Sequence, residues 1–249
     1  MFATLVSPKG GNMLAARVEV ETESKMKNVE EALGHYQMQM RNHPFRTLIA
    51  QGLVSEEIGK EFMKLQYIDS TLWVPMLAIM KDRVRNPVLK KALTDNLLCE
   101  AGARHTSHVT HCAEFLMSKG IDPYFGDLYH YSPLAKHPTE IMNSVIRMNE
   151  AQIAGWIMIA EMIVPDLFLL MRPMLFEMKA DLFYIDEHIS VDSDEHGEWM
   201  MKGIRDLLSE GVLEQDILDG IHLGGRVALC VPDALYAKVL RGKYEAKYS

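Results

Sequence analysis

The chain is poor in cysteine and lacks the spacings typical of a disulfide framework or a thiolate metal site. Its three cysteines, Cys99, Cys112 and Cys230, are far apart among 249 residues, and no two form a Cys-x-x-Cys motif. An odd number of scattered cysteines is typical of a reduced, intracellular chain. We therefore expect a cytoplasmic protein rather than a disulfide-stabilised secreted domain.

The chain also has fewer basic than acidic residues and lacks long apolar segments that are free of charge. The chain has 26 Lys and Arg against 34 Asp and Glu, with no basic stripe, so no nucleic-acid partner is expected. The most apolar stretch, 153–171, contains Glu161, Pro165 and Asp166, which predicts a buried helix and not a membrane span. The first residues lack the basic segment and long apolar run of a signal peptide.

Strand signals are equally sparse, because few β-branched residues alternate with polar ones. Helical periodicity predicts helices over about 22–42, 55–80, 87–120, 138–163, 180–209 and 213–241. A short helix should follow the break at 43–45, Pro75 should kink its helix, Pro165 should end or kink another, and residues 1–20 should be loosely ordered. We expect one all-α domain over residues 1–249, a compact bundle of seven or eight helices.

Two histidines and an aspartate recur at steps of four in the sequence HISVDSDEH. On a helix His188, Asp192 and His196 lie along one stripe. Imidazole and carboxylate together suit iron, manganese or zinc. A solvated acidic face has the same appearance, so this segment alone leaves both interpretations open.

Carboxylates at positions that should be apolar favour the interpretation as a metal site over a solvated acidic face. Glu161 lies in AQIAGWIMIAEMIVP, and an unpaired buried carboxylate is energetically costly. A buried salt bridge to an arginine is the alternative. We favour a metal or catalytic role for Glu161, because the small side chains of Ala154 and Gly155 on the same helix should leave room for a ligand. Glu100 also lies among small and apolar residues.

Histidines follow Glu100 at positions 105, 108 and 111, and one of them could share its face of the helix. Three carboxylates and three imidazoles exceed what one zinc needs and match two iron or manganese ions. No Glu-x-x-His occurs in the sequence, which disfavours the ferritin-like arrangement of ligands.

Four segments resemble the haem-oxygenase-like diiron oxidases, relatives of thiaminase II and pyrroloquinoline quinone synthase. They are NHPF (42–45), NLLCEAG with the following histidines and SKG (96–120), AGWIMIAEMIVPDLF (154–168) and YIDEHISVDSDEHG (184–197). The resemblance covers about 35–240 and implies a haem-oxygenase-like bundle with two Fe(II) ions inside, the second held loosely, and O2 as co-substrate. The ligands it implies are Glu100, His108, Glu161, His188, Asp192 and His196.

The chain departs from this family in spacing. Many members have His-x3-Asp-x2-His, whereas here His196 lies one residue later and Glu195 occupies the usual position. His108 is likewise one residue farther from Glu100, which a π-bulge would absorb. His105, His111 and Glu195 therefore stay as alternative ligands.

The substrate implied by the resemblance is a small organic molecule, and we favour an amino acid or derivative in a natural-product pathway. Arg147 precedes Glu161 by 14 residues on the expected helix and could clamp a carboxylate, or else pair with Glu150. Tyr184, one turn before His188, could hydrogen-bond the substrate or a metal ligand, or else belong to the core. No catalytic residue is assigned.

Competing functions remain open. A metal-free enzyme like thiaminase II would need a cysteine nucleophile, for which Cys112 and Cys230 are the candidates. A quinone-synthase-like enzyme would need many basic residues, and haem binding through one histidine would leave Glu161 and Asp192 unexplained. A non-catalytic binding protein with a vestigial metal site, and a homodimer, are both compatible with the sequence.

Overall fold

The computed structural model describes residues 9–103, 106–123, 136–179, 182–190 and 197–248. Within these ranges the regular structure is helical, and no strand occurs. The expected all-α bundle is confirmed.

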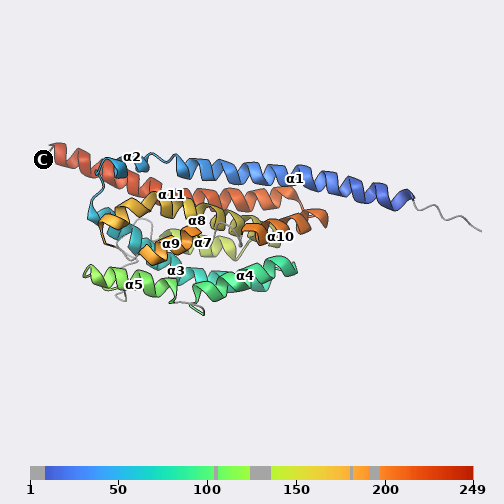
Figure 1. The fold of residues 1–249 in the computed structure, drawn as a ribbon, viewed down its shortest axis with the longest axis horizontal. Coiled ribbons are helices and arrows are strands. Elements are labelled where there is room, and N and C mark those ends of the chain that lie inside the picture. The colour runs from blue at the N-terminus through green and yellow to red at the C-terminus, as the bar shows by residue number, and fades with distance from the viewer. Residues whose placement is uncertain (1–8, 104–105, 124–135, 180–181, 191–196, 249) are drawn as a thin grey trace, which may run out of the picture.

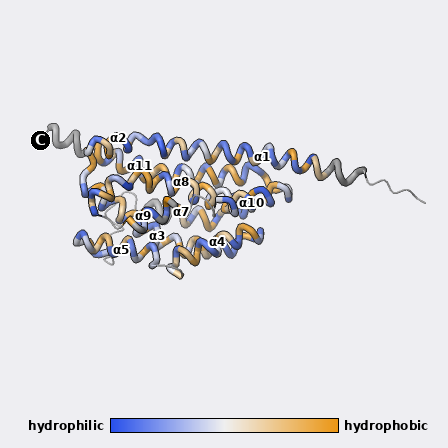
Figure 2. The backbone as a smooth tube through the Cα atoms, in the orientation of Figure 1, coloured by the Kyte–Doolittle hydropathy of each residue, from blue (hydrophilic) through white to orange (hydrophobic). Residues whose placement is uncertain are grey.

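Three long helices lie along one side of the bundle (Figure 1). They are α1 (Lys9–Arg41), α8 (Glu150–Glu177) and α11 (Glu214–Tyr248), and each contacts the other two. The first turns of α1 extend beyond the bundle at one end, and the last turns of α11 extend at the other. Helix α1 alternates between hydrophilic and hydrophobic residues along its length, as expected of a helix that buries one stripe (Figure 2).

Helices α8 and α11 approach closely because glycine lies at their crossing. A Cβ atom added at Gly155 would overlap the carbonyl oxygen of Ile217, and one at Gly220 would overlap that of Gln152. The expectation that Ala154 and Gly155 leave room for a ligand is therefore wrong for Gly155, since the backbone of α11 fills that space.

Helix α8 is apolar on all sides because it is the core helix. It is long and apolar enough to cross a membrane, but 72% of its most apolar window is buried inside the protein. The two buried charged residues of α8 have different partners. Arg41 on α1 donates to both carboxylate oxygens of Asp166, at 2.8 and 2.9 Å, whereas Glu161 faces the cavity described below.

The opposite side of the bundle is formed by α3 (Glu56–Arg83), α4 (Pro87–Glu100) and α5 (His108–Ser118). Asn86 caps α4 by accepting hydrogen bonds from the backbone of Val88 and Leu89. Shorter helices complete the bundle: α2 (Phe45–Ala50), α7 (Lys136–Val145), α9 (Leu182–Ser190) and α10 (Gly197–Ser209).

Several expected helix boundaries are wrong. Helix α1 begins at Lys9, so much of the segment expected to be loosely ordered is helical. Helix α8 runs through Pro165 and Pro173 to Glu177 instead of ending at the first proline. The expected helix 87–120 is described as α4 and α5, and the expected helix 138–163 is divided by the turn at 146–149. The helix expected over 180–209 is described as α9 and α10, and residues 191–196 lie outside the described part.

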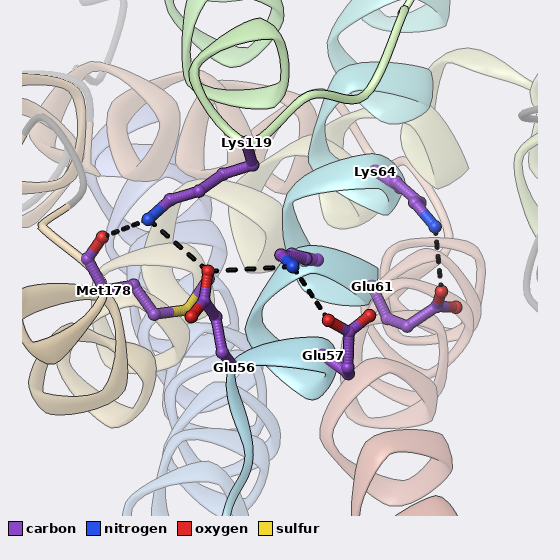
Figure 3. A network of polar contacts seen from close by, with 7 residues as sticks. Glu56, Glu57, Glu61, Lys64, Lys119 and Met178 are labelled. Atoms are coloured by element: carbon purple, nitrogen blue, oxygen red, sulfur yellow. Dashed lines mark hydrogen bonds and ion pairs between the residues drawn. The ribbon is translucent and has the colours of Figure 1, made fainter.

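Lys119, just after α5, joins that helix to two others (Figure 3). Its Nζ donates to the carbonyl oxygen of Met178, at the end of α8, at 2.6 Å, and lies 3.5 Å from Oε1 of Glu56 on α3. The contact satisfies one of the free carbonyls at the end of α8. It also fixes the end of α5 opposite to His108, with which that helix begins.

Candidate metal centre and its cavity

Glu161 lies at the middle of α8, whose start is fixed by a capping box between Asn149 and Gln152. The side chain is buried, and Nδ2 of Asn96 on α4 donates a hydrogen bond to its Oε1. One carboxylate oxygen thus has a neutral partner, which orients the group without neutralising its charge.

Glu100 and His108 meet because the chain turns between them. Glu100 is the last residue of α4, and Gly102 follows in the left-handed conformation with φ +78°. The backbone hydrogen bonds from Gly102 to Cys99 and from Ala103 to Leu98 make this end a Schellman motif. A turn, and not the expected π-bulge, thus absorbs the longer spacing, and His108 begins α5.

His188 on α9 is held as a neutral imidazole. Its Nδ1 lies 2.8 Å from the carbonyl oxygen of Tyr184, which can only accept, so Nδ1 carries the proton and Nε2 keeps its lone pair. Burial lowers the pKa of His188 to about 4, and the nearby His108 adds to this effect. A neutral imidazole with a free Nε2 is the form that binds metal.

Three of the sequence-predicted ligands come together in space. The ligand atoms of Glu100, His108 and His188 all lie within 4.8 Å of one another, and His108 and His188 have ring centroids 4.3 Å apart. Nδ1 of His108 lies 2.5 Å from Oε2 of Glu100. Carboxylate and imidazole ligands bind first-row metals at roughly 2.0–2.2 Å, so donors gathered this closely fit one shared ion.

A cavity of about 150 Å³ adjoins this triad. Glu100 and His188 belong both to the triad and to the cavity wall, and Glu161 lines the same cavity from α8. Further polar residues line it: Gln66, Asp69, Ser70 and Tyr184. Much of the remaining wall is apolar and includes Leu72, Trp73, Met76, Ile141, Trp156, Leu167 and Phe168.

Tyr184 supports the histidines of the site. Its ring centroid lies 4.5 Å from that of His188 and 5.2 Å from that of His108. Burial raises the pKa of its hydroxyl well above the usual value, so the phenol stays protonated. Its hydroxyl points to Oε1 of Gln66 at 3.5 Å, which is a weak contact. Tyr184 is part of the buried core and also lines the cavity, so its position is compatible with both roles expected for it.

Arg147 lies apart from this site. It is exposed in the turn between α7 and α8, not on the helix of Glu161 as expected, and it does not line the cavity. The alternative partner, Glu150, instead accepts hydrogen bonds from the backbone of Arg85 and Asn86. Asp192 and His196, together with the alternatives His105 and Glu195, lie outside the described residues. His111 begins the second turn of α5, where its ring stacks on Tyr184 and lies outside the triad.

Asp69 is the polar residue that sequence reasoning missed. It lies on α3 in LQYIDSTLW, with Gln66 one turn before it and Ser70 directly after it. These polar neighbours make Asp69 less conspicuous in the sequence than Glu161, whose neighbours are all apolar. Burial raises the pKa of Asp69 to about 7.

A family model described as iron-containing redox enzyme matches residues 60–227. This range contains every residue of the triad, the cavity carboxylates and Tyr184. The chain belongs to this family. The resemblance inferred from the motifs is therefore confirmed.

Solved structures with the same fold include three relatives of thiaminase II. A TenA homologue from Pseudomonas syringae has a TM-score of 0.64 at 9% identity, covering 85% of this chain and 92% of its own. A TenA homologue from P. horikoshii has a TM-score of 0.59 at 10% identity, covering 86% of this chain and 98% of its own. A putative TenA-like thiaminase from Sulfolobus solfataricus has a TM-score of 0.56 at 11% identity, covering 85% of this chain and 95% of its own. At these identities the similarity shows the fold alone. None of the curated proteins matches the sequence.

Proposed function

We propose that the protein is a non-haem iron oxidoreductase that binds two Fe(II) ions and uses O2 to oxidise a small organic substrate in its cavity. The observation that carries the proposal is the convergence of Glu100, His108 and His188, within 4.8 Å, at the wall of a cavity that Glu161 also lines. Iron bound there would supply the activation of O2.

The side chains of this site do three things. Glu100 and Glu161 supply negative charge that would offset the charge of two divalent ions. His188 presents its Nε2 lone pair because the carbonyl of Tyr184 holds the proton on Nδ1. The apolar wall, including Trp73, Trp156 and Phe168, keeps water from the reacting atoms.

Two further ligands are proposed from the sequence resemblance alone. Asp192 and His196 follow His188 at the spacing described above, and they would complete the second ion's coordination. The second ion would be the more weakly held of the two.

A metal-free enzyme with a cysteine nucleophile is less well supported. None of the three cysteines is among the described residues that line the cavity. Burial raises the pKa of Cys112 to about 12, so its thiolate is scarce near neutral pH. Cys230 is exposed on α11, and its pKa is also raised.

The test is an anaerobic Fe(II) titration of metal-stripped protein, followed by mixing with O2. We expect two ions per chain and a transient visible absorption band after mixing. Glu161→Gln should lower the number of Fe(II) ions bound per chain or lower the affinity of one site for Fe(II) at least tenfold, because a neutral amide is a poor ligand for Fe(II).

Glu177→Gln is the matched control, since Glu177 lies exposed at the end of the same helix. It should behave as the parent protein does. Iron binding no higher than background, or Glu161→Gln indistinguishable from the control, would refute the proposed function.

A further inference from the structure

The described part of the cavity wall is rich in carboxyl groups. Asp69, Glu100 and Glu161 contribute three carboxyl groups, and no lysine or arginine is among the described residues that line it. Two divalent ions at the proposed metal centre would offset the charge of Glu100 and Glu161, which leaves Asp69 as the carboxyl group with no metal assigned to it.

Of the three carboxyl groups, Asp69 is the one that the proposed metal centre does not use. Glu100 contacts His108, and Glu161 accepts a hydrogen bond from Asn96. Asp69 makes no hydrogen bond or ion pair with any residue in the described ranges. It keeps some accessible surface because it lines the cavity, yet protein atoms surround it closely.

A buried carboxylate without a partner is costly, and a cation bound beside it would remove that cost. Gln66 and Ser70, its neighbours on α3, line the same cavity and offer further hydrogen-bonding groups. Together they form a polar corner in a wall that is otherwise largely apolar.

The rest of the cavity suits a small hydrophobic body. The rings of Trp73 and Trp156 lie 5.2 Å apart, and both face the cavity together with Phe168. Its volume of about 150 Å³ is similar to that of an engineered apolar cavity that binds benzene.

We propose that Asp69 binds the ammonium group of the substrate, and that the substrate is a small amine with an apolar or aromatic body. This inference rests on the proposed function for its chemistry, but the binding step belongs to Asp69 and not to the metal ligands. It narrows the expected small organic substrate to one that carries an amino group.

Binding of three probes of one shape tests the proposal: benzylamine, benzyl alcohol and benzoate. Affinity is measured by calorimetry on metal-stripped protein and again on anaerobic Fe(II)-loaded protein. Benzylamine should bind at least tenfold more tightly than benzyl alcohol in both forms, and benzoate should bind least to the metal-stripped protein. Asp69→Asn should lower the affinity for benzylamine at least tenfold and change the affinity for benzyl alcohol less than twofold.

Asp82→Asn is the matched control, because Asp82 lies exposed near the end of the same helix. It should leave all three affinities unchanged. Equal benzylamine affinity in the parent and in Asp69→Asn would overturn the proposal. A metal-stripped parent protein that prefers benzoate, or that binds benzylamine no better than benzyl alcohol, would do the same. Because the metal-stripped protein is tested separately, a failure of iron binding is distinguishable from a failure of amine recognition.

Discussion

At the scale of the residue, the cavity holds ionisable groups whose environment changes their protonation. Asp69 has its pKa raised to about 7, and His188 has its pKa lowered to about 4, in both cases chiefly because burial disfavours the charged form. Both groups are therefore held uncharged over part of the pH range in which the unfolded chain would charge them.

Asp69 should make the protein less stable as pH rises. The unfolded chain releases this proton near pH 3.8, the ordinary pKa of an aspartate, whereas the folded chain keeps it until about pH 7. The folded state thus binds more protons in this window, so the free energy of unfolding falls there by up to about 1.4 kcal/mol per pH unit.

Asp69→Asn removes this dependence. Urea unfolding of the parent and the variant should show a stability difference that grows in favour of the variant from about pH 4 to about pH 7 and is constant above. A difference that does not change with pH would show that the carboxyl is ionised in the folded protein throughout.

Cys112 should be chemically inert in the folded protein. It is fully buried, and burial raises the pKa of its thiol to about 12. Iodoacetamide at neutral pH should label Cys230, which is exposed, much faster than Cys112, as peptide mass spectrometry would show. Rapid labelling of Cys112 would contradict this expectation and would support an enzyme with a cysteine nucleophile.

At the scale of the element, the turn between α4 and α5 decides whether two proposed ligands meet. Gly102→Ala places a Cβ at φ +78°, which should cost about 1–2 kcal/mol of stability. Because the Schellman motif sets the path from Glu100 to His108, the variant should also lose at least tenfold in Fe(II) affinity.

Gly120→Ala is the control for this effect. Gly120 has φ +72°, and a Cβ there would meet open space, so the same backbone cost applies far from the site. Its stability should fall by a similar amount while Fe(II) affinity is retained. Equal loss of metal affinity in both variants would show that general destabilisation, not the turn, controls the site.

At the scale of the whole molecule, the crossing of α8 and α11 holds the bundle together. Gly155→Ala would force its methyl group into the backbone of Ile217, and we expect a loss of about 3 kcal/mol or more. Gly34→Ala on α1 meets nothing within 4 Å and should instead stabilise the protein by about 0.5–1 kcal/mol. Urea unfolding should give these opposite signs, and a neutral Gly155→Ala would mean that the helices can separate at little cost.

The sequence alone determined the class of fold and two of the three carboxylates of the cavity. Helical periodicity and the lack of strand signals were sufficient for an all-α bundle, because both are local properties of the chain. Glu161 and Glu100 were identifiable because a carboxylate among apolar neighbours is anomalous at the level of sequence. The family also followed from short motifs that remain contiguous along the chain.

Only the tertiary structure decided which of these residues meet. His108 joins Glu100 through a turn that periodicity predicted as continuous helix, since one glycine can end a helix whose apolar pattern continues. Gly155 packs against α11, and a crossing of two helices cannot be predicted from either helix alone. Arg147 lies in a turn outside the cavity, and the position of a turn relative to a cavity likewise depends on several segments of the chain. Asp69 became prominent only when α3 was seen to line the same cavity as Glu161, since the charge balance of a cavity depends on every element that surrounds it.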